Sequence, residues 1–149
     1  MLRRRYLQNN CIEEIENLSH LKYLDTLNLE HNNITLIENL SDCPKLRTLN
    51  LAHNHLESVD DIEHLTECSL LSVLDLSHNK LDDPDILTIL EQIPSLAVLN
   101  LMGNDCVREI RNYRCVRPPL HFNNSFIVYG QPWHQENAHG SYTHVEVSR

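Results

Sequence analysis

The chain has 149 residues, which predicts one domain or at most two. Its 12 basic and 21 acidic residues give a formal net charge of −9, which argues against a general nucleic-acid-binding protein, whose surface would be basic. No stretch approaches 18 consecutive apolar residues, and no apolar segment follows the arginines after Met1, so we expect a cytoplasmic protein without a membrane span or a secretory signal.

The cysteines and the known catalytic motifs give no sign of a chemical site. The five cysteines are odd in number and no two have C-x-x-C spacing, which disfavours both a disulfide framework and a zinc site. The sequence has no glycine-rich phosphate loop, no G-x-S-x-G and no H-E-x-x-H motif. We therefore predict a protein that is not an enzyme, with no catalytic, cofactor-binding or metal-binding residues.

Asparagines recur in a single frame along most of the chain, at Asn10, Asn32, Asn54, Asn79 and Asn104. Leucines precede them at fixed distances, except that Arg5 replaces one in the first copy, and an aliphatic residue follows the first four two positions later, as in Leu24, Leu27, Leu29, Asn32 and Ile34. This is the leucine-rich repeat pattern, L-x-x-L-x-L-x-x-N-x-L. About five copies predict an α/β leucine-rich repeat solenoid, a horseshoe with a parallel concave sheet, over residues 1–116.

The expected strands lie at residues 4–8, 26–30, 48–52, 73–77 and 98–102, where alternate positions share one face. The last two intervals between asparagines are three residues longer, and the extra length is expected on the convex side. There Asp83 suits a helix N-cap and Pro84 the first helical position, and a weaker helix is expected from Asp60. In the shorter repeats we expect a 3₁₀ turn at the same place.

The two ends of the chain depart from the repeat. Residues 117–149 are polar, rich in histidine and without a repeat frame, so we expect a divergent, disordered tail, in which Phe126 to Tyr129 would form a strand only at an available sheet edge. Met1 falls at the start of a repeat with no capping unit before it, so we expect part of a longer protein.

The recurring asparagines are predicted to be structural. Each follows a strand where the chain turns inward and leaves backbone groups without a sheet partner, and an amide side chain offers two donors and an acceptor for them. His31, His53 and His78 also share one repeat position and are expected to stack at the rim of the concave face. Parallel neighbours diverge rather than converge on a metal ion, and a pH-sensitive contact is the alternative role.

The outward strand positions are expected to form one continuous patch on the concave face. They are Arg4, Tyr6, Gln8, Thr26, Asn28, Glu30, Thr48, Asn50, Ala52, Val73, Asp75, Ser77, Val98, Asn100 and Met102, and all but Ala52 are predicted to contact a partner. The patch is basic at its start, small and polar in its middle and apolar at its end, which suits a protein partner. Between Ile12 and Asp105 the net charge is −14, which favours a basic or mixed-charge partner, unless the acidity serves only solubility.

Longer strings of the sequence carry a resemblance. The 22-residue repeats with Ile-Glu-Asn-Leu at 15–18 and 37–40 resemble those of the phosphatase-regulator type. The strings at 52–57, 74–81, 83–87 and 99–104 resemble the ciliary leucine-rich repeat proteins of the axonemal dynein assembly factor family. The resemblance departs at residues 115–119, where Cys-Val-Arg-Pro-Pro replaces the start of that family's C-terminal cap.

This second resemblance implies a function. It implies an adaptor in the cytoplasm and cilium that binds axonemal dynein subunits and chaperones during preassembly of dynein arms, without catalysis. We also expect a monomer that binds neither nucleic acid nor membranes. The alternatives are a phosphatase-regulator-like scaffold, whose partner would be a phosphatase catalytic subunit, and a structural component resident in the axoneme. A subunit of an RNA particle is disfavoured by the acidic surface.

Overall fold

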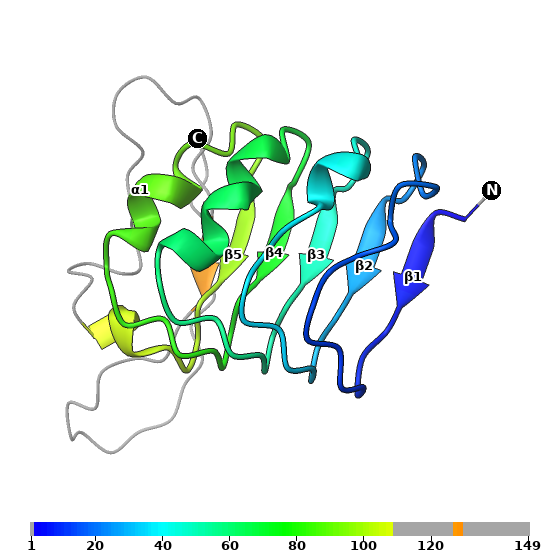
Figure 1. Cartoon of the computed structure of the whole chain (residues 1–149). Helices are drawn as coiled ribbons and strands as arrows, with labels where there is room; N and C mark the ends of the chain where they lie inside the picture. The colour runs from blue at the N-terminus through cyan, green and yellow to red at the C-terminus, as the bar shows by residue number, and fades with distance from the viewer. Residues whose placement is uncertain (1, 109–126, 130–149) are drawn as a thin grey trace, which may run out of the picture.

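The computed structural model describes residues 2–108 and 127–129. Its strands lie side by side in one parallel sheet, with 3₁₀ turns and a short helix on the opposite side of the coil (Figure 1). In sheet order they are β1 (Arg4–Tyr6), β2 (Thr26–Asn28), β3 (Thr48–Asn50), β4 (Val73–Asp75), β5 (Val98–Asn100) and β6 (Ile127–Tyr129). The predicted solenoid with a parallel concave sheet is confirmed.

The repeat frame sets the strand register. Leu27 pairs with Leu49, and Leu49 pairs with Leu74, so equivalent positions of successive repeats lie side by side. All three leucines are 0% exposed, and full burial of such a side chain stabilises a fold by about 1.5–3 kcal/mol. One repeat cannot bury its own leucines, so the core forms only by stacking neighbours.

Backbone hydrogen bonds between repeats continue beyond the three-residue strands. The N–H of Leu29 donates to the carbonyl of Asn50 over 2.8 Å, and the N–H of His31 donates to the carbonyl of Ala52 over 3.0 Å. The same two bonds recur between the later repeats. Each repeat is therefore held to the next over about five residues, the length that the alternating pattern predicted.

The convex side carries the elements that differ most between repeats. They are the 3₁₀ helices η1 (Leu40–Asp42) and η2 (Asp60–Glu67) and the helix α1 (Ile86–Leu90). A further 3₁₀ helix, η3 (Asp105–Arg108), directly follows Asn104. η2 lies between η1 and α1 and contacts both. Ile62, Leu65, Ile86 and Leu90 from these elements are buried in the same core as the strand leucines. The longer repeats thus place their extra residues on the convex side, as the spacing predicted.

Two details of the convex side correct the sequence prediction. The segment from Asp60 forms a 3₁₀ helix rather than an α-helix. The N-cap of α1 is Asp85 rather than Asp83, because the turn after Asp83 begins with i to i+3 bonds, including that from the N–H of Leu87 to the carbonyl of Pro84. The Asp83 carboxylate still accepts a 2.8 Å hydrogen bond from the N–H of Asp85.

Little of the predicted tail is described. Within residues 117–149 the described part is β6, which pairs in parallel with β5. The prediction of a disordered tail otherwise lies outside the described residues. In the part of the chain that the structure describes, no helix has the length and apolar character needed to cross a membrane.

Candidate functional site

The concave sheet face carries the side chains that alternate with the buried leucines. The register places Thr26 beside Thr48 and Asn28 beside Asn50, and it continues through β1, β4 and β5. Two rows of side chains result, the first of Arg4, Thr26, Thr48, Val73 and Val98 and the second of Tyr6, Asn28, Asn50, Asp75 and Asn100. All are exposed or half-buried. The structure therefore brings these predicted surface residues together.

A third row follows the strands and is less open than predicted. Its members are Gln8, Glu30, Ala52, Ser77 and Met102. Ser77 is 4% exposed, and its hydroxyl donates a 2.6 Å hydrogen bond to Asp75 Oδ1. The Ser77 side chain is therefore turned onto Asp75 and buried, so it is less open to a partner than predicted. Ala52 is equally buried, whereas the other three members retain access to solvent.

The amide and carboxylate side chains of the second row have a structural role that was not predicted from sequence. In each, Oδ1 accepts a hydrogen bond from the backbone N–H two residues later. The acceptors are Asn28, Asn50, Asp75 and Asn100, over 2.9, 3.0, 2.9 and 3.1 Å. Such bonds are typical of Asn and Asp at turns. The available signal was an Asn or Asp at this position in four successive repeats.

Two carboxylates are held in place on the face by neighbouring amides. Glu30 Oε2 accepts a hydrogen bond from Asn50 Nδ2 over 3.3 Å. Asp75 Oδ2 accepts one from Asn100 Nδ2 over 2.9 Å. Glu30 follows β2 and Asp75 ends β4, so negative charges lie on both sides of the repeat that contains β3.

The recurring asparagines bond across repeats. Asn54 Oδ1 accepts from the N–H of Ile34 over 3.0 Å, while its Nδ2 donates to the carbonyls of Leu51 and Leu29 over 3.1 and 3.0 Å. Ile34 and Leu29 belong to the preceding repeat, so the amide joins two turns of the coil. The equivalent bonds are made by Asn32, Asn79 and Asn104, all of which are buried.

Asn10 differs from the other four asparagines. It is exposed, and its Nδ2 donates to the carbonyls of Leu7 and Gln8 within its own repeat. Among the described residues no repeat precedes that of Asn10, so its amide has no neighbouring turn of the coil to bond.

His31, His53 and His78, here called the histidine file, stack ring on ring as predicted. The ring centroids of His31 and His53 lie 4.1 Å apart and those of His53 and His78 lie 4.3 Å apart, with interplanar angles of 10° and 9°. Their φ angles are 54°, 55° and 53°, a left-handed conformation that histidine adopts more often than most residues. This backbone conformation points all three rings in the same direction. The backbone N–H of each histidine still donates a hydrogen bond to the next repeat.

The same repeat position is held by different residues at the two ends of the file. Asn9 precedes it with a φ of 57°, and Gly103 follows it with a φ of 80°. A Cβ atom on Gly103 would lie 2.5 Å from Nδ1 of His78. Glycine therefore gives the last ring room to lie over the backbone.

The environment of the middle ring disfavours its charged form. Burial lowers the pKa of His53 below its usual value of 6.5, and the neighbouring His31 and His78 lower it further. Glu30 and Asp75 act in the opposite direction without cancelling these effects. The file therefore favours a neutral central imidazole between two carboxylates.

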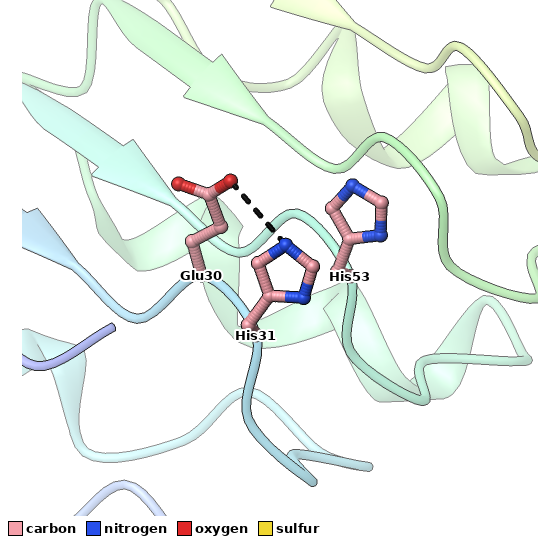
Figure 2. A group of neighbouring side chains, drawn as sticks. All are labelled: Glu30, His31 and His53. Atoms are coloured by element: carbon pink, nitrogen blue, oxygen red, sulfur yellow. Dashed lines mark ion pairs between the residues drawn. The ribbon is translucent and has the colours of Figure 1, made fainter. Parts of the chain in front are cut away.

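Glu30, His31 and His53 form a group that has the composition of a metal site (Figure 2). One ligand atom of each lies within 4.8 Å of the others, and Glu30 Oε1 lies 3.8 Å from His31 Nε2. Two ligands bound to one ion at about 2.1 Å lie no more than about 4.2 Å apart, and their lone pairs converge on it. The lone pairs of two nearly parallel rings do not converge, so this arrangement offers an ion at most one imidazole with Glu30.

The described cysteines are not arranged for chemistry. Cys43, Cys68 and Cys106 are buried and free, and Cys11 is exposed. Burial raises the pKa of both Cys68 and Cys106 to about 11, which disfavours the reactive thiolate. A cavity of about 150 Å³ between η1 and the end of η2 is lined by Cys43 and Cys68 among mostly small or apolar neighbours. Cys115 lies outside the described residues.

Comparison with known families identifies the repeats. Residues 24–65 match a family model described as "Leucine Rich repeats (2 copies)", and residues 67–90 match one described as "Leucine Rich repeat". No curated protein matches the chain significantly.

Solved structures share the architecture. A chain of the Drosophila melanogaster SNF/U2A′ complex is 28% identical with a TM-score of 0.59, and the match covers 64% of this chain and 57% of that one. Internalin C2 of Listeria monocytogenes is 27% identical with a TM-score of 0.59, over 80% of this chain and 47% of that one. An internalin, inlF, of the same bacterium is 24% identical with a TM-score of 0.56, over 68% and 27%. The chain thus spans between about a quarter and three fifths of the length of these structures.

Proposed function

We propose that this chain, which is a leucine-rich repeat protein, is a non-enzymatic scaffold that binds a protein partner on the concave face of its sheet. The observation that carries the proposal is the continuous set of in-register side chains across β1 to β5. Its amide and carboxylate groups are already oriented by hydrogen bonds, so a partner meets a rigid surface and little side-chain entropy is lost on binding.

The chemistry of the face favours a protein over a small molecule. The first strand offers Arg4 and the ring of Tyr6, which is 58% exposed. The other end of the face offers half-buried Val73, Val98 and Met102. A mixed surface with an aromatic residue and apolar edges is typical of protein interfaces. A structural neighbour was solved as part of the SNF/U2A′ complex, which also supports an interaction role.

The finer proposal is a role in preassembly of axonemal dynein arms. It rests on the resemblance of the strings at 52–57, 74–81, 83–87 and 99–104 to dynein axonemal assembly factor 1. The proposed partners are dynein subunits and chaperones, the proposed location is the cytoplasm and cilium, and the proposed state is a monomer. A phosphatase-regulator-like scaffold is the second candidate, favoured by the Ile-Glu-Asn-Leu strings of the 22-residue repeats.

The experiment is an affinity capture from ciliated-cell cytosol with paired charge reversals. Arg4→Glu with Glu30→Lys changes the concave face, while Lys22→Glu with Glu63→Lys changes exposed charges outside the sheet and leaves the net charge unaltered. We expect dynein chains and chaperones to be captured by the native chain and the control and to be lost with the concave reversal. Equal capture by both reversed proteins would move the binding site off the concave face.

The identity of the captured protein separates the candidates. A phosphatase catalytic subunit would favour the second candidate function. Sedimentation of the protein with isolated axonemes, in place of a soluble pool, would favour a structural component resident in the axoneme.

A further inference from the structure

We propose that the histidine file is a pH-responsive contact that accepts a basic segment of the partner while its rings are neutral and repels that segment when they are protonated. The proposal rests on the proposed function, because it assigns a partner chemistry and a form of regulation to the same concave face.

Charge complementarity points to a basic segment. Glu30 and Asp75 lie on the two sides of His53 and are held there by Asn50 and Asn100. Neither carboxylate has a Lys or Arg ion-pair partner among the described residues. A lysine or arginine side chain placed over this part of the face would meet two fixed negative charges and a neutral ring between them.

The stacked geometry makes protonation of His53 unfavourable. Three nearly parallel rings follow one another at 4.1 and 4.3 Å, so a proton on any ring places its charge close to the next. The charged and titratable groups that act on His53 are His31 and Glu30 from the preceding repeat and His78 and Asp75 from the following one. Protonation therefore introduces positive charge at the spot where the carboxylates would hold a basic side chain.

The direction of the pH effect on folding follows from the same groups. Burial and the flanking histidines lower the pKa of His53 in the folded chain below its usual 6.5. Between these two pKa values the unfolded chain binds more protons than the folded chain, so stability rises with pH. The contribution of His53 is fully present above about pH 6.5 and is lost as the pH falls towards its folded pKa.

The first test follows the imidazole resonances of the full chain by NMR between pH 4.5 and 8.5, with EDTA present to remove adventitious metal. We expect the His53 titration midpoint to lie below 6.5. His31→Asn with His78→Asn should move it upward, because both repulsion and burial are reduced. Asparagine suits the backbone of these positions, since Asn9 adopts the same conformation at the equivalent position.

A second variant separates charge from burial. Glu30→Gln removes an attraction and should lower the His53 midpoint further, whereas an effect of burial alone would leave it in place. A midpoint at or above 6.5 in the native chain, or one that neither change moves, would overturn the proposal.

The second test measures binding of a synthetic lysine- and arginine-rich peptide at pH 7.5 and pH 5.5 by backbone chemical shifts. We expect shifts around Glu30 and Asp75 and an affinity at least about fivefold weaker at pH 5.5, the lower end of the usual coupling between linked sites. In the chain with His31, His53 and His78 all changed to Asn, this pH dependence should be lost. Chemical-shift changes confined to acidic residues on the convex side, or equal peptide affinity at both pH values, would contradict the proposal.

These readouts differ from that of the proposed function. Loss of partner capture by the concave reversal tests whether the face binds a protein at all. The imidazole titration needs no partner, so the pH response can fail while protein binding on the concave face stands.

Discussion

Asn10 and Asn54 occupy the same position of the repeat, yet Asn10 is exposed and Asn54 is 3% exposed. The Asn54 side chain bonds to Ile34 and Leu29 of the preceding repeat, whereas the Asn10 side chain bonds only within its own repeat. The first repeat also has Arg5 where Leu27 and its equivalents stand. The same residue at the same repeat position therefore contributes more to stability in the middle of the array, because many of its hydrogen bonds there join two neighbouring repeats.

The largest contrast between the two regions is expected for leucine. Leu74→Ala removes a side chain that is 0% exposed between two repeats and should lower the free energy of unfolding by about 2–5 kcal/mol. Leu7→Ala, at a partly buried position of the first repeat, should lower the free energy of unfolding by clearly less. Urea denaturation measures both changes. Equal losses would mean that the first repeat is packed as firmly as the fourth.

The asparagines should show the same contrast on a smaller scale. Asn54→Ala leaves the N–H of Ile34 unpaired and removes one of the two amide donors to the carbonyls of Leu29 and Leu51, which Asn32 and Asn79 still bond. At about 1–3 kcal/mol for a buried unpaired group, we expect a loss of a few kcal/mol. Asn10→Ala is the matched control and should change the free energy of unfolding by less than about 1 kcal/mol, because its site is exposed. A change below about 0.5 kcal/mol for Asn54→Ala would refute the structural role.

Gly103 tests the last turn of the array. Gly103→Ala at a φ of 80° should lower the free energy of unfolding by about 1–2 kcal/mol. The new Cβ should also displace the His78 ring, seen as a change in its NMR resonances. With His78→Asn as background, the ring contact is absent and only the backbone cost should remain. An undisturbed His78 resonance would contradict the close approach.

The first repeat should become slightly more stable when its sequence matches the leucine-rich repeat pattern more closely. Arg5→Leu places an aliphatic side chain at a half-buried position equivalent to Leu27. In a thermal melt we expect the free energy of unfolding to rise by no more than about 1 kcal/mol, since this position is less buried than the equivalent positions of the later repeats. A loss of stability would mean that the Arg5 guanidinium makes a contribution that leucine cannot replace.

The reactivity of the cysteines compares the first repeat with the later repeats without any substitution in the chain. Cys11 of the first repeat is exposed, whereas the pKa of buried Cys68 is raised to about 11. At pH 8 that leaves on the order of one thiolate in a thousand. Iodoacetamide labelling followed by peptide mapping should modify Cys11 much faster than Cys43, Cys68 or Cys106. Comparable rates would indicate that the central repeats open readily.

The sequence predicted the features that depend on periodicity. The frame of leucines places Leu27, Leu49 and Leu74 in one buried row. A shared position one residue before the recurring asparagine stacks His31, His53 and His78. Repetition carries this information because any residue at a fixed position meets its own equivalent in the next repeat. The fold and the histidine stacking could be predicted for that reason.

The features that could not be predicted depend on local side-chain bonds. Alternation places Ser77 on the concave face, but the burial of its hydroxyl depends on the rotamer that reaches Asp75. Alternation likewise cannot show that Asn28 bonds to the N–H of Glu30. The position of the α1 cap was missed because the turn after Asp83 starts with 3₁₀ bonding.

The unequal lengths of the repeats have a consequence for how such a surface can vary. The interval from Asn32 to Asn54 is 22 residues and that from Asn54 to Asn79 is 25, yet Thr48 and Val73 remain paired across the longer one. The three additional residues are absorbed near η2, on the far side of the coil. Insertions there would leave the spacing of the concave side chains untouched, so the back of the molecule can be lengthened or grafted independently of its recognition surface.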